Sequence, residues 1–347
     1  MYDAIIVGFG LSGVAVAKHF ESLNKRILII DNNVSKASEV AAGIYNPITL
    51  KRFTLAWEAH EQLKYAKEFY SSLEKELNCN FDNALSIYRR FNSVEEQNNW
   101  FTKSTSPVFE KYIDPILKES ITDAVSAPFK YGKLNNTGRI NIKKLIQEYK
   151  KKLRKTNKYI EEKFDYEAIK FEEDSVSYNN TKAKRIIFCE GYGLKQNPFF
   201  NYLPLVGSKG SYLIIESPQL KLTVALKAHF YLIPVGSNQY KFGATYEHLF
   251  KGKDHDASAK EYLIDQLNKL IEVPYKILNH ETGTRPTVSD RRPLIGKHPE
   301  YEKLIVFNGM GSRGILIAPT MAKELVNSLF NEEDLPIDVD IKRFVST

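Results

Sequence analysis

Short apolar runs that end close to glycines or polar turns recur along the chain. Residues 4–7, 26–31, 184–191 and 304–307 each hold consecutive apolar side chains with little alternation. Runs of this kind are typical of parallel strands that are buried on both faces of a sheet. They predict one parallel sheet built from both ends and the middle of the chain.

Longer stretches carry apolar residues at helical intervals of three and four positions. This spacing predicts amphipathic helices with one face toward a core. The predicted helices cover residues 14–23 and 57–77, one that starts within 92–96, one opened by 138–141, and residues 257–271 and 315–330.

A second group of segments alternates between apolar and polar residues. Residues 210–216, 229–234 and 240–246 predict strands, and Gly236 and Asn238 between the last two predict a hairpin. Residues 85–91 and two or three segments within 158–179 also predict strands. Residues 102–138 contain three prolines and are expected to be irregular, with the question of a lid left open.

The combined pattern predicts an α/β chain, α+β overall, with two interleaved domains. A Rossmann-like domain is expected from residues 1–55, 138–200 and 281–347. A mostly antiparallel β-sheet domain carrying helices is expected from residues 56–137 and 201–280. The length of 347 residues suits two domains.

The turn after the first predicted strand carries a dinucleotide-binding fingerprint. Gly8, Gly10 and Gly13 have the G-x-G-x-x-G spacing between a strand and a helix, which is the context that the motif requires. The glycines allow a tight turn, close approach of the backbone to a pyrophosphate, and close packing of helix on strand. Asp31, which ends the second strand, is expected to accept hydrogen bonds from ribose hydroxyls. This stretch predicts a dinucleotide and leaves NAD and FAD open.

Two further segments allow a close approach to a ligand. Residues 308–314 form a second glycine-rich turn between the last predicted strand and the last helix. A chain whose two ends both build such a junction is expected to bring them to one ligand. Residues 41–43 are small, which suits either a cofactor contact or a tight helix–loop junction.

Composition narrows the class of protein. Hydrophobic residues make up 43% and charged residues 26%, as in ordinary globular proteins, and no apolar run approaches the length of a membrane span. The N-terminus lacks the features of a secretion signal, so a cytoplasmic location is expected. Cys79 and Cys189 have no metal-ligand spacing, so no metal site is expected.

The net charge of +7 is partly concentrated in one predicted helix. Residues 143–158 contain eight lysines and arginines on an amphipathic pattern. We interpret them as a solvated surface, with a basic patch for a nucleic acid or another anionic partner as the alternative.

Four blocks of the sequence carry a family resemblance. They are residues 8–31, residues 38–47, Gly283-Thr-Arg-Pro286 with Asp290-Arg-Arg-Pro-Leu-Ile-Gly296, and Gly309-Met-Gly-Ser-Arg-Gly-Ile-Leu-Ile-Ala-Pro319. In this order they resemble the glycine oxidase and D-amino-acid oxidase family of FAD-dependent amine oxidases. The fourth block also resembles the oxidase domain of the bifunctional enzyme that matures the tRNA wobble uridine, although no methyltransferase domain is present here.

The resemblance implies that FAD is the cofactor and that the Rossmann-like domain binds it. The last turn would wrap the flavin ring and stabilise negative charge on it. Arg313, which falls later in the turn than the arginine of glycine oxidases, would be either an added cation or a solvent-facing residue. The residues expected to contact FAD are Gly8, Gly10, Leu11, Ser12, Gly13, Asp31, Asn32, Ala42, Gly43, Ile44, Glu190, Gly191, Gly309, Met310, Gly311, Ser312, Arg313, Gly314 and Ile315.

The resemblance also implies a reaction that needs few protein groups. A neutral substrate amine would lose a hydride from Cα to flavin N5, and the imine would then hydrolyse. Arg285 is expected to hold the substrate carboxylate, because a guanidinium binds a carboxylate through two hydrogen bonds. His229 and Tyr231, two apart on one predicted strand, are expected to share a face over the flavin, and Tyr45 is expected to line the pocket.

Three hypotheses follow. The first is an FAD-dependent oxidase or dehydrogenase of a small amino acid or N-substituted glycine. The second is an FAD amine oxidase that removes a carboxymethyl group from tRNA. The third is a flavin-binding protein without turnover, which the Arg285 and Tyr231 pair argues against. The substrate, the electron acceptor, the covalent or non-covalent attachment of FAD and the oligomeric state stay open.

Overall fold

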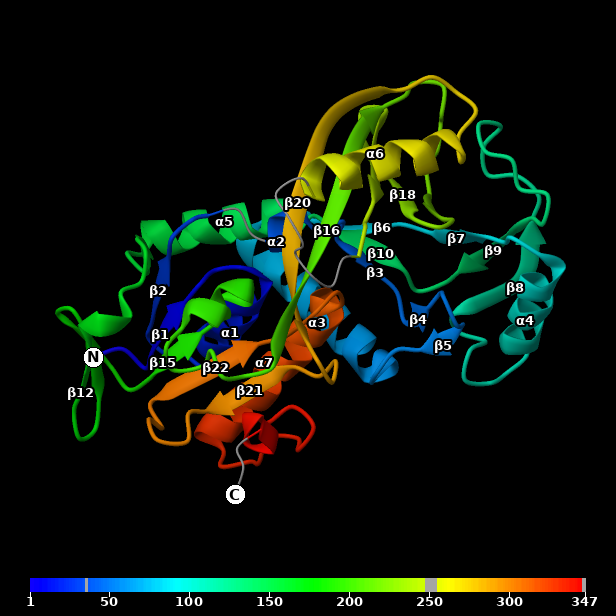
Figure 1. The fold of residues 1–347 in the computed structure, drawn as a ribbon. Helices are drawn as coiled ribbons and strands as arrows, with labels where there is room; N and C mark the ends of the chain where they lie inside the picture. The colour runs from blue at the N-terminus through cyan, green and yellow to red at the C-terminus, as the bar shows by residue number, and fades with distance from the viewer. Residues whose placement is uncertain (35–36, 247–254, 345–347) are drawn as a thin grey trace.

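A six-stranded sheet forms the base of the computed structural model, which describes residues 1–34, 37–246 and 255–344 (Figure 1). Its first five strands are parallel and β21 is antiparallel to them. All four predicted parallel strands lie in it. In spatial order the strands are β11 (Tyr159–Glu161), β2 (Ile27–Asp31), β1 (Ala4–Val7), β15 (Ile186–Phe188), β22 (Leu304–Asn308) and β21 (Leu294–Lys297).

Both faces of this sheet are buried, which explains the unbroken apolar runs. Ile6 and Ile29 pack into one core with helices, whereas Ile5 and Ile30 pack into another with a small sheet. The helices are α1 (Leu11–Ser22), α5 (Ile142–Lys155) and α7 (Gly314–Phe330), with α3 (Ala59–Leu77) packed on α7. The small sheet contains β12 (Ile169–Phe171), β13 (Val176–Tyr178) and β14 (Thr181–Ala183).

An eight-stranded, mostly antiparallel sheet forms the second layer. Helix α6 (His255–Asn268) covers one of its faces and contributes Leu263 and Leu267 to that core. In spatial order the strands of this eight-stranded sheet are β20 (Lys276–Val288), β16 (Leu205–Glu216), β19 (Gln239–Gly243), β18 (Tyr231–Gly236), β17 (Ala225–Lys227), β7 (Ile87–Arg90), β9 (Tyr131–Leu134) and β8 (Ile113–Lys118). The predicted hairpin is confirmed as the β18–β19 pair.

The remaining elements connect the two sheets. They are the strands β3 (Ile44–Tyr45), β10 (Gly138–Ile140) and β6 (Asp82–Ala84) of a third sheet, the pair β4 (Ile48–Thr49) and β5 (Thr54–Leu55), the helices α2 (Ala37–Val40) and α4 (Val94–Ser104), and the short 3-10 helices η1 (Tyr166–Ala168), η2 (Gly191–Gln196) and η3 (Ile341–Phe344).

The long strands β16 and β20 run from the base of the molecule up to α6 (Figure 1). They pair from Leu205 and Val288 at one end to Glu216 and Lys276 at the other. Their length places the lower half of β20 beside the six-stranded sheet and the upper half under α6. This pair therefore carries side chains across the junction of the two layers.

One sequence prediction about strands was wrong, and one long strand was missed. Residues 102–138 are not irregular, because they contain β8 and β9 at the edge of the large sheet. Prolines are tolerated in edge strands, and Pro115 lies in β8. Strand β20 was not predicted at all, because residues 276–288 are mostly half-buried and show no clear apolar alternation.

The chain has the predicted mixed α/β fold. The two sheets draw on alternating segments of the chain, as the predicted domain division requires, although position 281 falls inside β20. The domain boundaries themselves stay a prediction. Residues 35–36, 247–254 and 345–347 of the predicted domains lie outside the described residues.

Carboxylates bind most of the basic side chains of residues 143–158, the segment that was considered for an anionic partner. Lys152 and Lys158 bind Glu21 at 2.7 and 2.9 Å, and Lys150 lies 3.4 Å from Asp31. Charge that is neutralised in this way contributes little to a patch for a nucleic acid. Among the described residues, no helix is both long and apolar enough to cross a membrane.

Candidate active site

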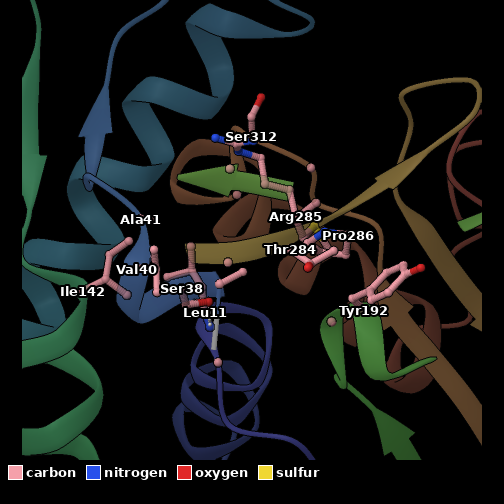
Figure 2. A pocket seen from close by; sticks show the side chains of 18 of the residues that line it. Leu11, Ser38, Val40, Ala41, Ile142, Tyr192, Thr284, Arg285, Pro286 and Ser312 are labelled. Carbon is pink, nitrogen blue, oxygen red and sulfur yellow. Dashed lines mark hydrogen bonds between the residues drawn. The ribbon is translucent and has the colours of Figure 1, made fainter. Parts of the chain in front are cut away.

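A cavity of about 1480 Å³ lies where the two large sheets meet. It exceeds the ~300–1,000 Å³ typical of pockets for drug-sized ligands. The turns that follow the parallel strands β1, β15 and β22 line it, because the carboxyl ends of parallel strands meet at one sheet edge. Leu11 and Ser38 lie on one side of this cavity, and Thr284 and Arg285 of β20 lie on another (Figure 2).

The first glycine turn is sterically fixed. Gly8 has a φ of +90°, and a Cβ on it would lie 2.7 Å from the carbonyl oxygen of Cys189. A Cβ on Gly13 would lie 2.2 Å from the carbonyl oxygen of Gly8, so Gly13 packs α1 against the turn and does not itself line the cavity. Helix α1 begins after Gly10, which provides no side-chain cap, and has no acid in its first turn; the Leu11 N–H donates to the Ser38 hydroxyl at 3.1 Å. Its N–H groups and dipole therefore suit a pyrophosphate.

The carboxylate of Asp31 holds this turn in place. It accepts hydrogen bonds from the Phe9 backbone N–H at 3.0 Å and from the Tyr159 hydroxyl at 2.8 Å. Burial and the charge of Asp31 raise the pKa of Tyr159. Asp31 lines the cavity, as does the exposed neighbour Asn32, but protein donors occupy both Asp31 oxygens. The predicted contact to a ribose would have to share this carboxylate with them.

The walls between the two turns are built from backbone and one buried carboxylate. Ala42, Gly43 and Ile44 line the cavity, and a Cβ on Gly43 would lie 2.0 Å from the carbonyl oxygen of Ile140. Glu190 accepts hydrogen bonds from Tyr166 at 2.5 Å and Asn197 at 2.8 Å. Burial raises the pKa of the Glu190 carboxyl, against the effect of these donors.

The second glycine turn joins the cavity to β20. The Gly311 N–H donates to the carbonyl oxygen of Pro286 at 3.0 Å, which places this turn beside Arg285. Gly309 does not line the cavity, because it packs against Val288 and Leu294. Helix α7 then begins at Gly314 with no acid in its first turn, as α1 does. The turn residues on the cavity wall are Met310, Gly311, Ser312, Arg313, Gly314 and Ile315, and Gly191, which follows β15, accepts a hydrogen bond from Asn308 at 2.9 Å.

Arg285 lies half-buried on the cavity face of β20. Its Nη1 donates to the Thr245 carbonyl at 3.2 Å, and its guanidinium lies 5.2 Å from the Tyr246 ring centroid. It also hydrogen-bonds the Tyr212 hydroxyl, whose pKa burial raises against the effect of this cation. A Cβ at Gly210 would collide with the guanidinium. Arg285 forms no ion pair with a carboxylate of the described residues.

Tyr231 and Arg313 form a second polar group on the wall. The Tyr231 hydroxyl lies 3.4 Å from Asn46 Nδ2, and the Arg313 guanidinium donates to the Asn46 carbonyl. Burial raises the pKa of Tyr231 to about 12, although Arg313 opposes the shift. Burial also lowers the pKa of Arg313. Of the two alternatives for Arg313, the structure therefore favours a half-buried cation on the cavity wall over a solvent-facing residue.

One expectation about the candidate catalytic residues needs correction, and one is met with a further constraint. His229 does not share a strand face with Tyr231, because it lies exposed in the turn between β17 and β18, with Nε2 3.4 Å from the Tyr262 hydroxyl. Tyr45 contributes to the wall, but its hydroxyl donates to Asp82 at 3.0 Å. That hydroxyl is therefore committed to a structural contact.

Sequence reasoning missed several polar residues of this wall, among them Asn46, Tyr212 and Lys227. Asn46 stands inside the resembling block at residues 38–47, and Tyr212 stands in a predicted strand. Lys227 precedes the predicted strand by two residues and had no motif to mark it. Only the register of the large sheet reveals that Lys227 and Tyr231 are neighbours.

The residues present fit FAD. The N-termini of α1 and α7 face one cavity, and neither has a side-chain cap from its capping residue. At Gly8 and Gly43 a Cβ would collide with backbone atoms. Walls without side chains at these positions let a large dinucleotide approach the backbone closely, with its pyrophosphate at the N-terminus of α1. Gly311 could present its turn to the flavin ring, because a Cβ there meets nothing closer than 3.9 Å.

Comparisons with curated proteins give partial alignments. Glycine oxidase of Bacillus subtilis (strain 168) is 26% identical over 148 residues, which are 41% of this chain and 40% of that protein. Glycine oxidase of Bacillus licheniformis is 27% identical over 124 residues, which are 35% of this chain and 34% of that protein. The chain thus matches less than half the length of these curated relatives.

Comparisons with solved structures cover the whole chain. Glycine oxidase from Geobacillus kaustophilus has a TM-score of 0.78 at 19% identity and covers 100% of this chain and 98% of its own. Iminodiacetate oxidase from Chelativorans sp. BNC1 has a TM-score of 0.75 at 15% identity, with 99% of each chain covered. These likenesses establish the fold. The model of the DAO family, described as FAD dependent oxidoreductase, matches residues 3–328, and the chain therefore belongs to this family of FAD-dependent oxidoreductases.

Proposed function

We propose that the chain oxidises the C–N bond of a small amino acid or N-substituted glycine. The observation that carries this proposal is the half-buried Arg285 guanidinium, which lies beside the second glycine turn without a carboxylate partner among the described residues. A guanidinium that is partly removed from water stabilises an anion more than it would in solvent. A substrate carboxylate would satisfy it.

The protein groups then act by binding and orientation. FAD, when bound, supplies the two-electron chemistry that oxidises the substrate amine. Arg285 would hold the carboxylate, while the Tyr231 hydroxyl and Asn46 would contact polar groups of the substrate. The positive charges of Arg285 and Arg313 would lower the pKa of a bound ammonium, because like charges disfavour the charged form. They would favour the neutral amine, which must lose a hydride from its Cα. Water then hydrolyses the imine to a carbonyl compound and an amine or ammonia.

The substrates named for the similar proteins agree with this choice. Glycine and iminodiacetate both contain an amine joined through one CH2 group to a carboxylate. This common unit is the one that Arg285 would orient toward the second glycine turn. We therefore extend the proposal to substrates of the form R–NH–CH2–COO⁻.

The two other hypotheses have less support. A tRNA substrate calls for positive charge around the site, but Glu21 and Asp31 bind three lysines of the segment that was considered. A flavin-binding protein without turnover has no need of two half-buried guanidinium groups on the cavity wall. We do not carry either hypothesis further.

Product analysis tests the proposal. Incubation of the FAD-loaded protein with glycine or sarcosine and an electron acceptor should release glyoxylate, measured as its hydrazone. Glycinamide, in which a neutral amide replaces the carboxylate, should react at least ~100-fold more slowly, because it lacks the charge-assisted pair with Arg285. Equal rates for glycine and glycinamide would contradict carboxylate recognition. Absence of carbonyl product from small amino acids and N-substituted glycines with any acceptor would exclude the proposed function.

A further inference from the structure

Lys227 belongs to a row of residues that crosses the cavity face of the large sheet. It pairs directly with Tyr231, which pairs with Gly243, which in turn pairs with Tyr212. Directly paired residues of antiparallel strands project to the same face. Tyr212, Tyr231 and Lys227 all line the cavity, and the Tyr212 ring covers Gly243, where a Cβ would lie 2.7 Å from it. The opposite face of these strands packs against α6.

The charge of Lys227 is not neutralised by the protein that surrounds it. Its Nζ lies 5.0 Å from the Tyr231 ring centroid and donates to the carbonyl oxygen of His229. Arg89 of the adjacent strand β7 is also cationic, but it has its own partner, Glu96, at 2.7 Å. Within the described residues no carboxylate forms an ion pair with Lys227.

Two other lysines on this sheet show the contrast. Lys241 lies two residues before Gly243 in β19, on the same face of the sheet, and binds Glu281 at 2.5 Å. Lys209 of β16 also lines the cavity and forms an ion pair with Asp256. Burial would be unfavourable for these ammonium groups without such partners. Lys227 is half-buried, and its ammonium group has only a carbonyl oxygen and an aromatic ring as partners.

Burial lowers the pKa of Lys227 to about 8, and the positive charge of Arg89 contributes. The other groups that face it are His229 in the adjoining turn, whose pKa is also lowered by burial, and the Tyr231 phenol. None of these groups is an anion at neutral pH. An anionic ligand would therefore be stabilised by Lys227 below a pH of about 8 and would lose that stabilisation above it.

We propose that Lys227 binds a second carboxylate of the substrate, so that the amines bound most tightly by this protein are dicarboxylic. This inference rests on the proposed function, in which Arg285 holds the first carboxylate beside Tyr212. The strands β16 and β17 are three strand spacings apart, or ~14 Å at ~4.8 Å each. The substrate would form a charge-assisted hydrogen bond of about 2.8 Å to Arg285 at one end and to Lys227 at the other. The remaining distance leaves room for a short chain between its two carboxylates. The amine would lie on the cavity side of Tyr212 and Tyr231.

Calorimetric titration with inert analogues tests this inference separately from turnover. Oxydiacetate and methoxyacetate carry an ether oxygen in place of the amine, and they have two carboxylates and one carboxylate respectively. At pH 6.5 the FAD-loaded protein should bind oxydiacetate at least ~10-fold more tightly than methoxyacetate. Lys227→Met should reduce this ratio to about one and change the affinity for methoxyacetate less than ~3-fold. Lys118→Met is the matched control, because Lys118 also lies over a tyrosine ring, at 5.7 Å, but does not line the cavity.

A pH series distinguishes the ammonium from a merely structural role. In the wild-type protein the preference for oxydiacetate should fall as the pH rises from 6.5 to 9.5, whereas Lys227→Arg should retain it throughout, since arginine stays charged. Equal affinities of the wild-type protein for both analogues would overturn the inference, as would an equal loss for both in Lys227→Met. If the dicarboxylate preference depends on Lys227 but no amine is oxidised, the inference stands and the proposed function fails.

Discussion

Replacing Arg285 with alanine is expected to lower kcat/KM for amines that carry a carboxylate by about 10²- to 10³-fold, while FAD remains bound. Removing one partner of a desolvated charge pair costs about 2–5 kcal/mol, which corresponds to a loss of this order. The guanidinium lies against Gly210 and Tyr212 and makes no ion pair with a described carboxylate, so its removal should leave the fold intact. Steady-state kinetics and the flavin absorbance of the purified variant provide the measurements.

Two companion variants give this prediction its controls. Arg285→Lys keeps the positive charge but cannot form the bidentate hydrogen bonds, so its decrease in kcat/KM should be intermediate. Arg291→Ala removes an exposed arginine of the same segment, which does not line the cavity, and should behave as the wild-type protein. If Arg285→Ala keeps wild-type activity on glycine-type substrates, the carboxylate must bind elsewhere.

Replacing Gly8 with alanine is expected to weaken FAD binding by at least ~10-fold. A side chain at its φ of +90° costs about 1–3 kcal/mol, and the new Cβ would also lie 2.7 Å from the Cys189 carbonyl oxygen. The turn can relieve this contact only by moving away from β15, which disturbs the wall that would hold the pyrophosphate. The FAD content after purification and the Kd for added FAD measure the effect.

Gly236→Ala is the matched control for this variant. Gly236 also has a positive φ, of +108°, but nothing lies within 4 Å of the Cβ position, and the residue is outside the cavity. The control should lose some stability and keep its FAD. If both variants bind FAD as the wild-type protein does, the first glycine turn does not hold the cofactor.

The sequence predicted the structure best where an element is determined by residues that are close together in the chain. The apolar runs and glycine spacings at residues 4–31 and 304–330 predicted two strand–turn–helix units, and the structure contains both. The short parallel strands β1, β15 and β22 are adjacent in the sheet, so the turns that follow them meet at one edge. Local patterns therefore identified most of the cavity wall expected to hold the cofactor.

The substrate end of the cavity was harder to predict, because it depends on pairing between distant segments. Tyr212, Tyr231 and Lys227 become neighbours only through the register of four strands, and periodicity within one strand does not reveal that register. His229 was placed on the strand because the apolar pattern continues through it, whereas β18 begins at Tyr231. The partners of Asp31 and Tyr45, which are Tyr159 and Asp82, likewise come from distant parts of the chain.

Anaerobic titration of the purified protein tests the central claim most directly. The protein should be yellow from bound FAD, and a panel of glycine, sarcosine, D-amino acids, proline and iminodiacetate should include at least one amine that bleaches the oxidised flavin absorbance. Glycinamide should not bleach it under the same conditions. The account would be contradicted by a protein that cannot be reconstituted with FAD, or by bound FAD that no carboxylate-bearing amine of the panel reduces.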